Sequence, residues 1–203
     1  MNKIKLIVTA CLLGINTVTF AQFMNTRSAS NNSEYTENSG WSGLRLSYEF
    51  MELEKLDING LSVGYAYAFP ISHSTPIVLE FIPSVLWMNN DEDGDKLNAV
   101  SIATPVNFGY KLAVDNFTFF PYIGLNTRIN VWGEGKDNYY GENFDLFDKD
   151  EGNCKRFQLG WHIGVGMHIQ KFVAGISYGT DFTEFAKDAD KLSSLKLSIG
   201  FNF

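Results

Sequence analysis

The chain has 203 residues, of which 15% are aromatic, 18 are glycine and only 19% carry a charge. A composition this apolar excludes a disordered protein, and a net charge of −7 without a basic stripe excludes a nucleic-acid partner. Beyond the N-terminal segment there is no run of about 20 apolar residues, which excludes a polytopic helical membrane protein. The abundant glycine and aromatic residues favour β-structure.

Residues 1–21 have the pattern of a signal peptide. Lys3 and Lys5 form a basic start, an apolar stretch follows, and Thr19-Phe20-Ala21 places small residues where a signal peptidase cleaves. We therefore expect an exported protein whose mature chain begins at Gln22.

A second processing site competes with the first. Val8-Thr9-Ala10-Cys11 matches the lipobox of bacterial lipoproteins, so lipidation of Cys11 stays open. Residues 22–40 are polar and rich in serine and asparagine, which predicts a flexible N-terminal linker in front of the fold. If Cys11 leaves with the signal peptide, Cys154 is the one cysteine of the mature chain, and an internal disulfide is excluded.

From Trp41 to the C-terminus, apolar and polar residues alternate with period 2, the pattern of strands with two different faces. In the first segment, for example, Leu44 and Leu46 share one face while Arg45 and Ser47 share the other. The segments are long enough to cross a bilayer as tilted strands, which takes about 9–11 residues. Eight of them follow one another, at 41–50, 60–69, 77–87, 99–112, 117–132, 156–169, 172–182 and 194–203.

The connections between these segments alternate in length. The long connections hold 17 of the 23 acidic residues and are at 51–59, 88–98, 133–155 and 183–193. Short inner turns and long outer loops are typical of bacterial membrane barrels. The sequence therefore predicts an all-β fold, an eight-stranded antiparallel up-and-down transmembrane β-barrel over 41–203, with an acidic outer rim.

The polar face of the segments is dominated by glycine, alanine, serine and asparagine, which suits the crowded interior of a narrow barrel. Buried charges need partners, so we expect the charged residues of this face to pair across the lumen. They are Arg45, Glu49, Glu80, Lys111, Arg128, Arg156, Asp181 and Lys196. The alternative is a soluble exported sandwich or lipocalin-like carrier, whose polar faces are solvated.

Three stretches resemble the small outer-membrane β-barrels of Gram-negative bacteria, most closely the porin-like "outer membrane protein beta-barrel domain" family. They are Pro121–Leu125, Gly160–Gly166 and the C-terminal Leu195–Phe203. In that superfamily the last strand carries the signal read by the barrel-assembly machinery, and Phe201 and Phe203 fit it, although Ser198 stands where glycine is usual. The resemblance implies a monomer in contact with outer-membrane lipid.

No catalytic constellation is visible. Of the three histidines, His73 falls in a predicted inner turn, while His162 and His168 lie on the polar face of one segment, where lumen filling is the simpler interpretation. We expect no enzyme activity, no cofactor and no resident metal ion. The acidic segments 91–95 and 133–155 could hold divalent cations or a surface ligand. The leading prediction is a structural or adhesive outer-membrane protein, and the alternative is a narrow passive channel.

Overall fold

The structure is a computed structural model that describes residues 40–54, 56–72, 75–92, 95–114, 117–136, 143–148, 154–186 and 191–203. The predicted signal peptide with Cys11, the predicted linker up to residue 39, and His73 lie outside the described residues. None of the described residues belongs to a helix long and apolar enough to cross a membrane.

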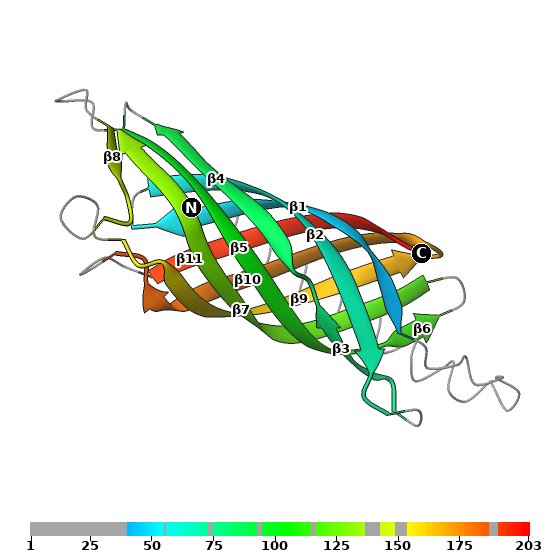
Figure 1. Cartoon of the computed structure of the whole chain (residues 1–203). Coiled ribbons are helices and arrows are strands. Elements are labelled where there is room, and N and C mark those ends of the chain that lie inside the picture. The colour runs from blue at the N-terminus through cyan, green and yellow to red at the C-terminus, as the bar shows by residue number, and fades with distance from the viewer. Residues whose placement is uncertain are drawn as a thin grey trace, which may run out of the picture. The chain divides into compact units, whose positions relative to one another are not determined.

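The described residues form one antiparallel sheet of eleven strands (Figure 1). In chain order these are β1 (Trp41–Leu53), β2 (Leu56–Pro70), β3 (Ile77–Phe81), β4 (Ser84–Glu92), β5 (Asp95–Tyr110), β6 (Leu112–Val114), β7 (Phe117–Lys136), β8 (Asn143–Asp145), β9 (Phe157–Ile169), β10 (Phe172–Glu184) and β11 (Lys191–Asn202).

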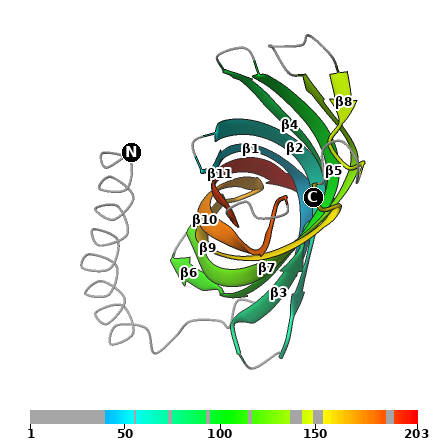
Figure 2. The same cartoon turned by 90° about the vertical axis from the view of Figure 1, so that its left-hand side faces the viewer.

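The sheet closes on itself, because β1 pairs with both β2 and β11, and β5 pairs with β7 (Figure 2). Eight strands make the ring. The short β3 and β4 share one position between β2 and β5, β6 pairs with β7 directly after β5, and β8 is an added strand on β7. The fold class predicted from the alternation is thereby confirmed.

One predicted segment, 77–87, is interrupted at Ile82 and Pro83, which separate β3 from β4. Proline has no N–H to give to a ladder, so it breaks the strand locally. The neighbours keep the seam closed, since Ile82 N–H donates to Pro105 O and Tyr65 N–H donates to Pro83 O, each at 3.0 Å.

The two ends of the barrel differ. At the end where β1 begins and β11 finishes, here called the terminal end, the β9–β10 turn is formed by Gln170 and Lys171 alone. The opposite end, here called the loop end, carries the β1–β2, β4–β5, β7–β9 and β10–β11 connections. Phe203 N–H donates to Ser42 O at 2.9 Å, so the last residue completes the closure between β11 and β1.

The prediction of a long loop is wrong for two segments, 51–59 and 88–98. In place of a loop over 51–59, β1 and β2 run on to a tight hairpin in which Leu53 pairs with Leu56, and Glu54 takes a φ of 54°. In place of a loop over 88–98, β4 and β5 continue until Glu92 pairs with Asp95. Apolar and polar residues still alternate in both segments, but here apolar residues such as Met51 and Ile58 point inward and polar ones point outward. This reversal interrupts the pattern of the membrane-spanning part, so the segments resembled loops.

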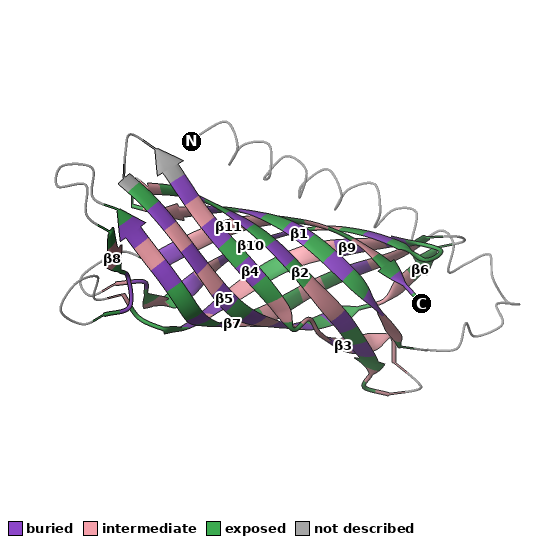
Figure 3. Cartoon of the chain, turned by 45° about the horizontal axis from the view of Figure 1, so that its top comes forward, coloured by how far each residue is buried: buried purple, intermediate pink, exposed green. Residues whose placement is uncertain are grey.

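The outward face is an apolar belt, because every long strand of the ring exposes large apolar side chains. Figure 3 shows how exposed and buried positions alternate along the strands. Along β1, for example, Leu44, Leu46, Tyr48 and Phe50 are 39–51% exposed while the residues between them are buried. A surface this apolar on a closed barrel matches the lipid-facing band of membrane barrels. Aromatic residues near the rims are at least 43% exposed, namely Phe157 where β9 begins at the loop end and Phe69, Tyr110, Phe117, Phe172 and Phe203 near the terminal end. Trp87 and Tyr178 are exposed near the middle of β4 and β10.

Candidate functional site: a charged and closed lumen

The lumen gathers charges from distant parts of the chain. Six of the eight charged residues singled out in the sequence form three ion pairs inside the barrel, which are Arg45–Glu80, Glu49–Lys196 and Arg128–Asp181. All but Lys196 are buried to the point of less than 10% side-chain exposure. Because unpaired buried charges are costly, each pair removes a penalty that would otherwise oppose folding.

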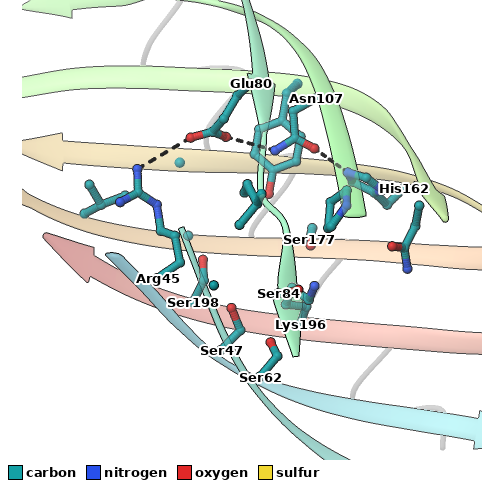
Figure 4. A pocket seen from close by; sticks show the side chains of 18 of the residues that line it. Arg45, Ser47, Ser62, Glu80, Ser84, Asn107, His162, Ser177, Lys196 and Ser198 are labelled. Carbon is teal, nitrogen blue, oxygen red and sulfur yellow. Dashed lines mark hydrogen bonds and ion pairs between the residues drawn. The ribbon is translucent and has the colours of Figure 1, made fainter. Parts of the chain in front are cut away.

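Glu80 is the centre of the pair nearest the terminal end (Figure 4). Its carboxylate accepts hydrogen bonds from Trp41 Nε1 at 2.8 Å and from Asn107 Nδ2 at 2.9 Å, and it lies 3.5 Å from Arg45 Nη2. The amide oxygen of Asn107 in turn lies 2.5 Å from His162 Nε2. The network therefore joins β1, β3, β5 and β9, and so ties opposite walls of the barrel together.

The second pair belongs to the seam that closes the barrel. Glu49 on β1 and Lys196 on β11 are register partners, and Lys196 Nζ lies 2.7 Å from the Glu49 carboxylate. Ser62 Oγ on β2 donates to the same carboxylate oxygen at 3.5 Å. The alternation along β1 and β11 places Glu49 and Lys196 on the inward face, and the register of the two strands places them opposite each other.

The third pair lies nearer the loop end. Arg128 Nη2 on β7 lies 2.6 Å from the Asp181 carboxylate on β10, spanning the intervening strand β9. Gln158 on β9 fills the gap, because its amide oxygen accepts from Arg128 Nε at 2.8 Å and also from Nη2. This geometry satisfies the guanidinium from two strands at once.

The two remaining charged residues take other positions. Arg156 precedes β9 and is exposed, so its placement in the lumen is corrected; its guanidinium donates to Asn130 O and Val131 O and lies 5.1 Å from the Phe147 ring centre. Lys111 lies between β5 and β6 and is half-buried, with its backbone N–H donating to Pro76 O at 2.7 Å.

A small polar cavity is lined by both the first and the second ion pair. Its volume is about 60 Å³, which gives room for roughly four to six waters, since one water needs about 10–15 Å³. Serine hydroxyls from several strands line it together with the charged residues, and they are Ser47, Ser62, Ser84, Ser177, Ser194 and Ser198 (Figure 4).

Apolar side chains close the lumen at the loop end. This apolar plug consists of Met51, Ile58, Leu86, Met88, Leu97, Ala99, Leu146, Phe147 and Leu192, each at most 9% exposed. Part of it comes from the β7–β9 connection, which folds back so that Leu146 N–H donates to Gly133 O and Cys154 N–H donates to Leu146 O. Gly133 leaves room beneath it, since a Cβ there would lie 2.5 Å from the Phe147 ring and would force that ring to shift.

A second apolar layer closes the terminal end. Phe120 is 1% exposed and packs with Val78 and Ala68, and its ring meets that of Trp41 edge-on at 5.1 Å. The His168 ring lies 4.7 Å from the same tryptophan ring. The lumen therefore holds two apolar closures with polar and ionic layers between them.

The sequence interpretation did not foresee these closures, because it assigned the apolar face to the outside throughout. Met51, Ile58, Met88 and Leu97 were placed in loops, although each sits in a segment whose alternation continues. The usable signal was the exchange of faces, with Asp57 and Asn59 pointing outward beside Ile58.

The two described histidines, His162 and His168, have different partners. His162 contacts Asn107, and His168 lies 3.4 Å from Asn202 Nδ2 and against Trp41. Among the residues that the structure describes, no cluster of three or more His, Cys, Asp or Glu side chains could hold a metal ion. The candidate cation segment 91–95 has no described side chains, and much of 133–155 also lies outside the described residues.

Cys154 lies in the β7–β9 connection, outside the long strands. Its backbone forms an isolated β-bridge with Ala186, and the residue packs against the apolar plug. Burial raises the pKa of its thiol to about 11, because a desolvated thiolate is disfavoured. Since the thiolate is the reactive form, we expect maleimide labelling at pH 8 to be about a hundredfold slower in the folded than in the unfolded protein. Labelling rates in a Cys11→Ser variant measure this, and equal rates in both states would contradict the burial.

No family model and no curated protein matches the chain. Among solved structures it is similar to Neisserial surface protein A (NspA), with a TM-score of 0.51 and 14% identity, over 80% of this chain and 95% of that one. It is also similar to the outer membrane enzyme PagL, with a TM-score of 0.52 and 13% identity, over 77% of this chain and 98% of that one. Identities this low show the fold alone, which is that of outer-membrane β-barrels.

Proposed function

We propose that the chain is an integral outer-membrane β-barrel without enzymatic activity, which acts through its loop end and does not conduct solutes. The observation that carries this proposal is the closed lumen inside an apolar belt. A belt of exposed Leu, Ile, Val and aromatic side chains suits lipid on the outside. The plug, the three ion pairs and the Phe120 layer fill the inside.

The orientation follows from the two ends. With an even number of strands in the ring, both ends of the barrel chain lie at the terminal end, which we place in the periplasm, as is usual for such barrels. The loop end then faces outward, and the strand ends and connections there, within 51–59, 88–98, 133–155 and 183–193, hold 17 of the 23 acidic residues. This favours a structural or adhesive role in which the acidic rim meets divalent cations or a surface ligand.

Assembly and stoichiometry belong to the same proposal. Phe201 and Phe203 point outward on the last strand at 37% and 68% exposure, where a barrel-assembly machinery can reach them. The ring is complete within one chain, so we propose a monomer in outer-membrane lipid, reached after export by the predicted signal peptide.

Cell fractionation tests the location. We expect the protein in the outer-membrane fraction, solubilised by detergent alone, with faster gel migration before boiling than after. The exposed apolar belt is the reason, because it needs lipid or detergent. Recovery in the soluble periplasmic fraction would overturn the proposal in favour of a lipocalin-like carrier.

Planar-bilayer recording tests the closed lumen. We expect no single-channel steps from the purified protein, because the plug residues and the ion pairs leave only a cavity of about 60 Å³. An eight-stranded barrel of known open conductance serves as the positive control. Reproducible steps from this protein would instead support the narrow channel.

A further inference from the structure

The lipid-facing belt carries a groove of about 590 Å³ on the outer surface of the terminal half, across β9, β10, β11 and β1 and reaching Val63 on β2. Its outward side chains include Leu44, Met167, Ile199 and Phe201, and its walls are almost wholly apolar. It lies over the seam where the last strand meets the first, between strands that lie side by side in Figure 1.

Ala174 creates the hollow. It is the outward residue of β10 that pairs with Met167 on β9 and Ile199 on β11, and its small side chain stands between these larger neighbours. Phe172, two residues nearer the terminal end, is 66% exposed and forms one wall. The depression is therefore centred on a small side chain and has large side chains on each flank.

A cation stands at the terminal edge of this groove. Lys171 belongs to the tight β9–β10 turn and is exposed, and its Nζ lies 5.7 Å from the ring centre of Phe201, which also lines the groove. The Phe172 and Phe201 rings pack edge to face at 5.5 Å beneath it. An ammonium group held over an aromatic ring keeps a defined position at the interface.

We propose that this groove binds one phospholipid of the leaflet at the terminal end, with an acyl chain along Ala174 and the phosphate at Lys171. The proposal rests on the membrane insertion proposed above. An acyl chain matches the apolar walls, and a phosphate matches the charge at the rim. A phospholipid carries an acyl chain and a phosphate in one molecule. Because the groove faces the lipid, a phospholipid of that leaflet can enter it directly.

Native mass spectrometry of the full mature protein, folded in micelles doped with dimyristoylphosphatidylglycerol, tests the site. We expect one retained lipid for each barrel. Ala174→Phe fills the groove and should weaken retention about tenfold, since the chain loses its buried contact. Lys171→Gln should weaken retention about fivefold. The same loss is expected with dimyristoylphosphatidylethanolamine, because the phosphate is common to both lipids.

Matched controls separate the groove from general damage. Val85→Phe adds a ring to an exposed outward position on β4, and Lys191→Gln removes an exposed lysine at the loop end; neither should change retention. Equal lipid retention by Ala174→Phe and Val85→Phe would overturn the proposal. It would also be overturned if Ala174→Phe changed the fraction of dimer in the spectra and left lipid retention unchanged, because the groove would then bind a second copy of the chain. Faster gel migration before boiling verifies folding of every variant, so a failure of membrane insertion is distinguished from a failure of the lipid site.

Discussion

Replacing Arg128 with methionine is expected to lower the free energy of unfolding by about 3–5 kcal/mol, because the change leaves Asp181 buried without its cation. The two side chains are 3% and 9% exposed and 2.6 Å apart. Gln158 would also lose the guanidinium that its amide oxygen accepts from. Urea titration of the barrel in phospholipid vesicles, monitored by the fraction of unboiled fast-migrating protein, measures the loss.

An exposed pair of similar length supplies the control. Lys155 Nζ lies 2.8 Å from the Glu184 carboxylate with both side chains nearly half exposed, so Lys155→Met should cost only about 0–1 kcal/mol. The double variant Arg128→Met with Asp181→Leu should recover most of the stability, because it removes both charges together. If Arg128→Met is no more harmful than Lys155→Met, the Arg128–Asp181 pair does not stabilise the barrel more than an exposed pair does.

Replacing Phe147 with alanine is expected to lower the free energy of unfolding by about 3–5 kcal/mol, since a large buried ring would leave a cavity. Phe147 is 7% exposed, packs over Gly133 and anchors the β7–β9 connection in the apolar plug. Its backbone N–H donates a hydrogen bond to Asp145 Oδ1 at 2.8 Å, which helps to fix the position of the residue. The same urea titration measures the effect.

Phe147→Leu tests whether ring volume is the cause. Leucine keeps most of the apolar contact, so the loss should fall to about 1 kcal/mol. Equal losses for alanine and leucine would contradict a volume-driven role. No loss for either variant would show that the connection does not pack into the barrel mouth in membranes.

The lipid-facing belt was predictable from single strands, because each outward position is determined by parity along its own segment. Leu44, Tyr178 and Phe203 are outward as the alternation indicates. Counting the segments with that alternation predicted eight strands, and eight strands make the ring, although the sheet as a whole has eleven.

The contents of the loop-end lumen were not predictable in the same way. Met51 and Ile58 lie in segments where the inward residues are apolar and the outward residues polar, the reverse of the membrane-spanning part. A local pattern does not say on which side of a strand water lies. That depends on how far the strand extends past the membrane, and on which loop covers the barrel mouth.

The sequence by itself determined the eight alternating segments, the apolar belt and the inward direction of six of the eight charged residues singled out from it, because side-chain direction in a strand depends only on local geometry. The tertiary structure alone decided which charges pair. Arg45 meets Glu80 across β2, and Arg128 meets Asp181 across β9, because the register and curvature of the closed sheet bring strands that are not neighbours within reach. It also removed Arg156 from the lumen, since that residue precedes β9 at the rim. The composition alone gives the numbers of acidic, charged and aromatic residues, and only the closed barrel shows where in the molecule these residues lie.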